Sequence, residues 1–195
     1  MTKRKKITVG ILFFVLLIVG IPLIQLATFS TQTAGRIEVN HTIDAPYLMS
    51  GTREFNLVYF GYVGCARVCT PILERVDEMY SSAPFIPLHD KLGVLFVNLM
   101  PELEPHQPDQ FAKSFNPGFE GVYLSQKELM TIDRDFNLFF SKSLSDKTEI
   151  NHSDYLYLVR RTPMGELILV NIYMTHPLNS EMILKDIRTL VKDNH

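Results

Sequence analysis

The sequence lacks a strong excess of charge of either sign, and this absence limits the partners that it can bind. Its 19 lysine and arginine residues and 21 aspartate and glutamate residues give a formal net charge of −2 at pH 7. Without a basic balance we expect no nucleic-acid partner, and without an acidic run we expect no solvated tail. Internal repeats and low-complexity segments are absent as well. The 195 residues suffice for one domain with its own core and an appendage.

Cysteine is scarce too, because Cys65 and Cys69 are the only two in the chain. They stand four residues apart in YFGYVGCARVCTP, directly after an apolar run. A disulfide between them would close a short loop, so it would stabilise the fold only weakly. Structural disulfides are also typical of small domains with little core, unlike the domain expected here. A structural disulfide is therefore a weaker interpretation of the two cysteines than disulfide exchange or metal binding.

The N-terminus contains the one long stretch without charge. A basic cluster at residues 3–6 precedes residues 7–29, and the next charged side chain is Arg36. An apolar helix of this length can cross about 30 Å of hydrocarbon, and the basic flank would stay in the cytoplasm. A cleaved signal peptide is the alternative, but no small-x-small cleavage site follows the run. We expect a cytoplasmic flank (1–6), a transmembrane anchor in the lipid bilayer (7–29), a polar linker (30–54) and an exported domain (55–195).

Apolar patterns after residue 54 predict alternating strands and helices. Strands are expected at 55–62, 93–99, 155–160 and 167–172, the first two buried on both faces. Helices are expected at 68–80, 110–115, 128–140 and 180–192. This order indicates an α/β layer fold. With a cysteine motif between the first core strand and its helix, a thioredoxin-like domain is the predicted fold class.

The position of the cysteines at a helix start favours thiolate over thiol, because the helix N-terminus carries positive potential. Arg67 between them acts in the same direction. Their spacing is one residue longer than the C-x-x-C of redox motifs. Helical positions four apart have Cβ atoms about 5–6 Å from each other, beyond the roughly 3.5–4.5 Å of a disulfide. Bridging stays open if Cys65 precedes the helix, and two thiolates equally suit Cu(I) or zinc.

A third metal ligand would come from the six histidines of the chain. His152 stands directly before the strand expected at residue 155, in a segment that can return to the cysteine end of the sheet. It is therefore the preferred candidate. Met100 offers a soft sulfur, but a core methionine is its simpler interpretation. The remaining histidines are interpreted as solvated residues in the linker, loops and C-terminus: His41, His89, His106, His176 and His195.

Three separated segments resemble the Sco/SenC family of copper-binding assembly factors for cytochrome c oxidase. They are YFGYVGCARVCTP at 59–71, FNPGFEGVY at 115–123 and NHSDYLYL at 151–158, in the family's order. The resemblance implies a thioredoxin-like fold in which Cys65, Cys69 and His152 bind copper as Cu(I) or Cu(II). It also implies a role at the dinuclear copper centre, CuA, of oxidase subunit II or at another copper-site protein.

The sequence departs from that family pattern around the cysteines. Ala66 and Arg67 stand where the family usually has proline and an acidic residue, and Gly64 stands where it has histidine. Asn98 and Asn151 each replace an aspartate. Fewer carboxylates leave less negative charge to attract a copper cation, and Arg67 opposes the cation directly.

The resemblance therefore predicts a membrane-anchored copper metallochaperone rather than an enzyme. A thiol–disulfide reductase using Cys65 and Cys69 is the alternative, and it would tolerate the loss of His152. A copper or redox sensor that acts through a partner is the third interpretation. The absence of an arginine- and serine-rich transit peptide favours a bacterial inner membrane, with the domain facing the periplasm.

Overall fold

The computed structural model describes residues 35–49, 53–142 and 149–193, together with Phe14, Leu16 and residues 18–20. Contacts divide the chain into two units, Met1–Ala34 and Gly35–His195. The predicted flank and most of the predicted anchor at 7–29 lie outside the described residues. Within the part of the chain that is described, no helix has the length and apolar character needed to cross a membrane.

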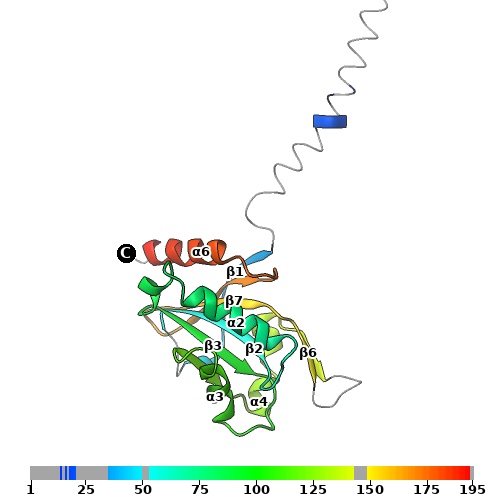
Figure 1. The fold of residues 1–195 in the computed structure, drawn as a ribbon, viewed down its shortest axis with the longest axis vertical. Coiled ribbons are helices and arrows are strands. Elements are labelled where there is room, and N and C mark those ends of the chain that lie inside the picture. Colours follow the sequence, from blue (N-terminus) through cyan, green and yellow to red (C-terminus); the bar gives the residue numbers. More distant parts are fainter. Residues whose placement is uncertain are drawn as a thin grey trace, which may run out of the picture. The chain divides into compact units, whose positions relative to one another are not determined.

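Strands and helices alternate along the second unit (Figure 1). The strands are β1 (Arg36–Ile43), β2 (Phe55–Gly61), β3 (Leu92–Asn98), β4 (Phe119–Val122), β5 (Phe140–Lys142), β6 (Ile150–His152), β7 (Leu156–Arg161) and β8 (Leu167–Tyr173). The α-helices are α2 (Cys69–Tyr80), α3 (Gln107–Lys113), α4 (Gln126–Leu129), α5 (Ile132–Phe136) and α6 (Ser180–Asp193), and short 3₁₀ turns are η1 (Pro46–Leu48) and η2 (Ile86–Leu88). The α/β alternation predicted from the apolar patterns is confirmed.

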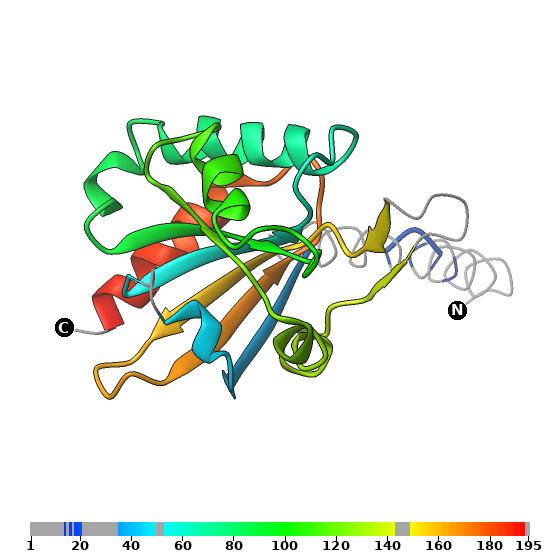
Figure 2. The ribbon, with the colours of Figure 1, turned by 90° about the horizontal axis from the view of Figure 1, so that it is seen from below.

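Six strands form one mixed sheet in the order β1-β8-β7-β2-β3-β4. β2, β3 and β4 run parallel, and β7 joins β2 in antiparallel fashion. The helical crossovers from β2 to β3 and from β3 to β4 are what parallel pairing requires. β5 and β6 pair separately, as a two-stranded ribbon past the end of the main strands (Figure 2).

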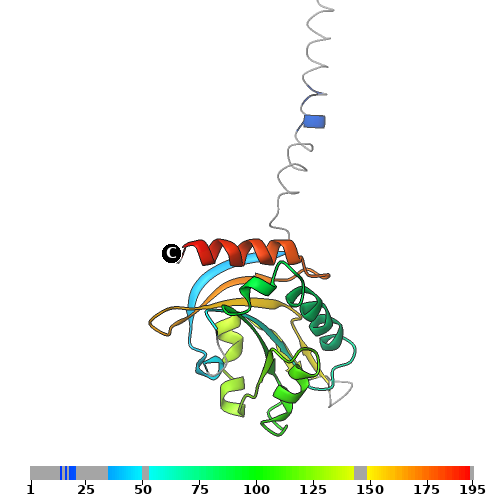
Figure 3. The ribbon, with the colours of Figure 1, turned by 60° about the vertical axis from the view of Figure 1, so that its left-hand side comes forward.

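Strand β2 occupies the middle of two hydrophobic cores, one on each face of the sheet. All seven of its residues are buried. Leu57 and Tyr59 belong to the core beneath α2 and α6, whereas Val58 and Phe60 belong to the core beneath η1, α4 and α5. The two groups of helices lie on opposite sides of the sheet (Figure 3). A strand that is covered on both faces has a continuous apolar sequence, and this run is the pattern that predicted β2.

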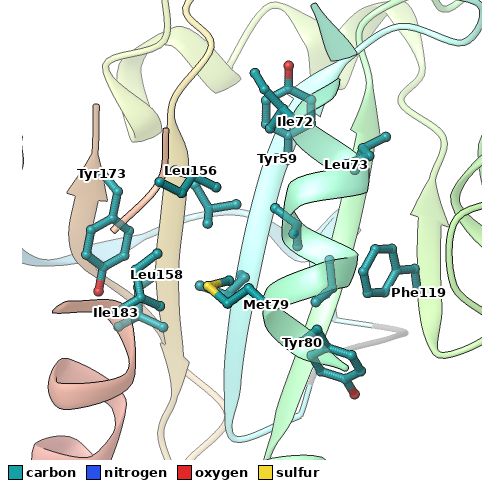
Figure 4. Close-up of a cluster of buried hydrophobic side chains, with 14 of the residues drawn as sticks. Tyr59, Ile72, Leu73, Met79, Tyr80, Phe119, Leu156, Leu158, Tyr173 and Ile183 are labelled. Carbon is teal, nitrogen blue, oxygen red and sulfur yellow. The ribbon is translucent and has the colours of Figure 1, made fainter. Parts of the chain in front are cut away.

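Helix α2 presents one apolar face to that first core, as its helical spacing predicted. Figure 4 shows Ile72, Leu73, Met79 and Tyr80 of α2 turned toward the sheet, near Phe119 of β4. The helix begins at Cys69 rather than at residue 68 and ends at Tyr80. The sequence therefore located both the helix and the cysteine at its start.

The prediction of a polar linker at residues 30–54 is wrong for residues 36–43. These residues form β1, which pairs antiparallel with β8 along the edge of the sheet. Only Ile43 of this strand is buried, because an edge strand contacts few neighbours. The polar side chains that suggested a linker are thus the exposed positions of an edge strand.

A buried charge network fixes the start of β1. The Arg36 guanidinium pairs with Asp186 of α6. The other oxygen of Asp186 accepts hydrogen bonds from Tyr173 at 2.9 Å and from Asn171 at 3.0 Å. Because its partners satisfy the carboxylate, this buried charge ties β1, β8 and α6 together.

The single helix expected at residues 128–140 is also wrong. The chain instead forms α4 and α5, and residue 140 begins β5. Ser125 caps α4 through a capping box with Glu128. Asn137, at φ 51°, ends α5 in the left-handed region. Phe139, expected on the apolar face of the helix, is 66% exposed.

Candidate metal centre

The loop between β2 and α2 depends on two glycines. Gly64 has φ +87°, a left-handed conformation that side chains disfavour. At Gly61, an added Cβ would lie only 2.8 Å from Cys69 Sγ and 3.1 Å from Phe96 Cε2. Glycine at the end of β2 therefore leaves the space in which the Cys69 thiol packs.

Cys65 acts as the cap of helix α2. Its Sγ accepts a hydrogen bond from the Cys69 backbone N–H at 3.4 Å. Its carbonyl oxygen accepts hydrogen bonds from the Thr70 backbone N–H and the Thr70 hydroxyl, both at 3.1 Å. Val68, at the N-cap position, makes no side-chain hydrogen bond to the helix. Cys65 therefore accepts from the N–H groups of the first helical turn, which have no partner within the helix. The predicted placement, with Cys65 in the loop and Cys69 at the helix start, is confirmed.

His152, the last residue of β6, faces the second cysteine. Its Nε2 lies 3.8 Å from Cys69 Sγ. Its Nδ1 lies 3.0 Å from the Ser153 carbonyl oxygen, which can only accept, so Nδ1 donates and the lone pair of Nε2 is left to accept from the Cys69 thiol. The expectation that this segment returns to the cysteine end of the sheet is confirmed.

The distance between Cys69 and His152 suits a shared metal ion. Metal–sulfur bonds of about 2.3 Å and metal–nitrogen bonds of about 2.0–2.1 Å place the two donor atoms about 3.5–3.8 Å apart at tetrahedral to trigonal angles. Across residues 35–49, 53–142 and 149–193, however, no three or more histidine, cysteine, aspartate or glutamate side chains make a ready metal cage. The arrangement is one pair of donors, Cys69 and His152, with Cys65 joined to it through a backbone hydrogen bond.

The surroundings of the pair combine aromatic rings with a few charges. The His152 ring meets Tyr59 and Tyr62 edge-on, with centroids 6.4 and 6.2 Å away. A cavity of about 430 Å³ opens beside Cys65 and His152. Arg67 and Glu149 bring opposite charges to its lining, so the cavity offers no strong excess of negative charge to a cation.

The two thiols differ in acidity although both are buried. Burial alone would raise the pKa of Cys65, but interactions with the Cys69 N–H and thiol and with the Tyr62 hydroxyl outweigh it, and the pKa lies below its ordinary value. Burial raises the pKa of Cys69 to about 12, and the neighbouring Cys65 contributes to the rise. Both cysteines are free thiols in this structure. Cys65 is thus the thiol more readily converted to a thiolate.

Asn98, at the end of β3, connects the cysteine loop to the next loop along the sheet. Its Oδ1 accepts from the Val63 N–H at 3.2 Å, and its Nδ2 donates to the Met100 carbonyl at 2.7 Å. A carboxylate could accept the first bond but could not donate the second. Met100 itself lines a different cavity, beside Leu99 and Phe140.

The other described histidines serve elsewhere. Three of them have Nε2 near a backbone carbonyl oxygen: His41 near Asp135, His89 near Tyr80 and His176 near Asp154. His106 precedes α3, and His195 lies outside the described residues. Tyr59 and Tyr62 were not predicted as parts of the site, although they lie within or next to the apolar run before Cys65, whereas Asn98 was predicted only as a replacement for a family aspartate near the copper ligands.

Comparison with known proteins gives a family and a fold. Residues 49–192 match the family model described as SCO1/SenC. The mitochondrial protein SCO1 homolog of Homo sapiens is 26% identical over 116 residues, which cover 57% of this chain and 38% of that protein. The chain thus corresponds to well under half the length of this relative.

Two solved structures share the architecture. Arabidopsis thaliana ScoI with copper bound has a TM-score of 0.59 at 18% identity, covering 78% of this chain and 99% of that one. BsSco, described as having a disulfide switch and as a member of the Sco family of cytochrome c oxidase assembly proteins, has a TM-score of 0.51 at 14% identity, covering 77% and 91%. The predicted thioredoxin-like α/β fold is confirmed.

Proposed function

The chain belongs to the SCO1/SenC family, and from this premise we propose that it binds copper and assists the assembly of cytochrome c oxidase. Two similar proteins support the proposal, because ScoI from Arabidopsis thaliana binds copper and BsSco is grouped with the oxidase assembly proteins. The similarity to BsSco extends to 77% of this chain. The receiving protein would be oxidase subunit II, at its CuA centre, or another copper-site protein.

The proposed ligands are the thiolates of Cys65 and Cys69 and the imidazole of His152. The observation that carries this assignment is the 3.8 Å separation of Cys69 Sγ and His152 Nε2, with the histidine proton held on Nδ1. Thiolate and imidazole are the donors that copper prefers in proteins. With copper as cargo, donors of a target protein would replace these three ligands one at a time, each new bond forming as a bond to Cys65, Cys69 or His152 breaks, so that the ion is never released to water.

The proposed location is a bacterial inner membrane. The uncharged run at residues 7–29, after the basic cluster at 3–6, would anchor the chain in the lipid bilayer with the domain in the periplasm. Such an anchor would hold the copper centre near a membrane-bound target and thereby raise its effective concentration there.

Copper binding by the full chain tests the ligand assignment. We expect the reduced wild type, kept without oxygen, to bind one copper tightly in competition with a chelator. His152→Ala should weaken Cu(II) binding by at least about tenfold, since one of three donors is lost. His176→Ala is the matched control, because that imidazole contacts Asp154 rather than a cysteine. Copper binding that is negligible, or equal in wild type and His152→Ala, would exclude this function.

A thiol–disulfide reductase is the second candidate, and the contrast between the two thiols favours it. Cys65, with its lowered pKa, would attack a disulfide of the target protein, and Cys69 would resolve the mixed disulfide. Reduction of a small-molecule disulfide at the wild-type rate by His152→Ala, together with loss of the reaction in Cys65→Ser, would favour this candidate.

A further inference from the structure

Tyr59 of β2 carries a polar group that the fold does not use. Its side chain is 0% exposed, and its hydroxyl has no hydrogen-bond partner among the residues that the structure describes. Buried hydroxyls are nearly always paired, because an unpaired one destabilises the folded state. Either the protein tolerates this cost at Tyr59, or the partner is formed only in another state of the protein.

The hydroxyl lies at the cysteine end of helix α2. In Figure 4 it points toward the end of α2 at which Cys69 begins the helix. The Tyr59 Cε1 and the Cys69 Sγ lie 3.2 and 2.8 Å from the same point, the place that a Cβ on Gly61 would occupy. The Tyr59 ring also meets His152 edge-on. Two of the proposed copper ligands therefore surround this ring.

Tyr59 can act in this place only as a donor. A phenol keeps its proton at neutral pH, so the Tyr59 hydroxyl faces the Cys69 sulfur as a donor. A protonated thiol is a weak acceptor. The hydroxyl makes no hydrogen bond within normal limits, although Tyr59 and Cys69 are close enough to interact through their side chains. A metal-bound thiolate sulfur is a stronger acceptor, because it carries negative charge.

We propose that Tyr59 is a positioning residue of the copper centre, whose hydroxyl donates a hydrogen bond to the Cys69 sulfur when copper has taken the place of the thiol proton. The inference rests on the proposed copper function. On binding, the thiol proton leaves to the buffer and the phenol keeps its own proton. The hydroxyl is thus unpaired without copper and paired with it, which shifts the equilibrium toward the loaded state.

Tyr157 of β7 provides a matched control within the same sheet. Its hydroxyl is likewise buried and unpartnered, and its side chain is 0% exposed. It belongs to the opposite core, where its ring meets Phe60 and Phe136 at 5.3 and 5.5 Å. No cysteine belongs to that core, so only the surroundings of the hydroxyl distinguish the two tyrosines.

The experiment compares Tyr59→Phe and Tyr157→Phe in the full, reduced chain without oxygen. Without copper, both variants should unfold at a temperature about 2–4 °C higher than the wild type, since each loses an unpaired buried hydroxyl. With copper, Tyr59→Phe alone should bind about tenfold more weakly. Its sulfur-to-Cu(II) charge-transfer band should also move to longer wavelength, because the sulfur loses a hydrogen bond.

Three results would overturn the inference, and they are distinguishable. Wild-type copper affinity and absorption in Tyr59→Phe would show that the hydroxyl does not contact the loaded centre. Equal copper changes in both variants would indicate a general packing effect. A lower unfolding temperature for copper-free Tyr59→Phe alone would show that the hydroxyl is already paired. Failure of the wild type itself to bind copper would instead exclude the proposed function.

Discussion

The candidate centre joins two regions that differ sharply in burial. The junction of β2 and α2, which carries the cysteines, lies in the main core: all seven residues of β2 are buried, and Cys69 is 0% exposed. The β5–β6 ribbon, which carries His152, has no buried residue in either of its three-residue strands. The cysteines thus lie within the main core, whereas His152 lies on a ribbon whose strands contain no buried residue.

This difference indicates where stability and binding can be separated. Segments with many buried contacts open only with the whole fold, whereas segments with few open locally at low cost. Substitutions at the junction should therefore damage the fold and the site together. Substitutions in the ribbon should damage the site alone.

The largest effect is expected from Gly61→Val, which breaks the junction. The new side chain would overlap Cys69 Sγ, so we expect a loss of about 2–3 kcal/mol in the free energy of unfolding. Urea denaturation measures the change. Asn151→Val, at an exposed position of β6, should stay within about 0.5 kcal/mol of the wild type. Equal losses in the two variants would contradict the separation of the two regions.

A smaller effect separates the two cysteines within the junction. Thiolates react with alkylating agents and thiols do not. With its lowered pKa, Cys65 should be alkylated at least about tenfold faster than Cys69 between pH 6 and 8, and its rate should level off at a lower pH than that of an ordinary thiol. The Cys69 rate should still be rising above that pH, toward its pKa of about 12.

Peptide mass spectrometry after timed alkylation identifies the modified residue. In denaturing urea the two cysteines should react at similar rates, because both pKa shifts come from the folded structure. A Cys69 that reacts as fast as Cys65 in the folded chain would contradict the assigned acidities.

The smallest effect is expected from Arg67→Glu at the rim between the two regions. Arg67 lines the cavity beside His152, so reversing its charge should raise copper affinity about threefold at low salt. The gain should shrink at 0.5 M salt, where screening limits the reach of a surface charge to about 4 Å. Arg75→Glu, with its charge outside this cavity, is the control. A gain that is equal in both variants would indicate net charge rather than position.

The contrast between the regions also explains what the sequence could predict. β2, β3, α2 and α6 produce apolar runs or helical spacing, because their burial is extensive, and each was placed to within a residue or two. β1 was interpreted as linker because only Ile43 of its eight residues is buried. The ribbon strands were not predicted, since three residues with none buried leave no periodic pattern.

The site divides in the same way. The strand, the loop and the helix start that hold the cysteines followed from local sequence. The closeness of His152 to Cys69 came chiefly from the family resemblance, since no local pattern reports a contact across 83 residues. The unpaired hydroxyl of Tyr59 could not be predicted, because a sequence shows that a tyrosine is in a core but not what its oxygen meets.

The backbone contact of His152 has a consequence for how this protein can evolve. The imidazole is oriented by the carbonyl oxygen of residue 153, an atom that every amino acid supplies. The contact with Nδ1 therefore does not depend on the side chain of residue 153, which here accepts a separate hydrogen bond from the Phe139 N–H at 3.3 Å. Natural variation is expected to accumulate beside His152 while its orientation is inherited unchanged, so that sequence divergence around this histidine need not signal divergence of function.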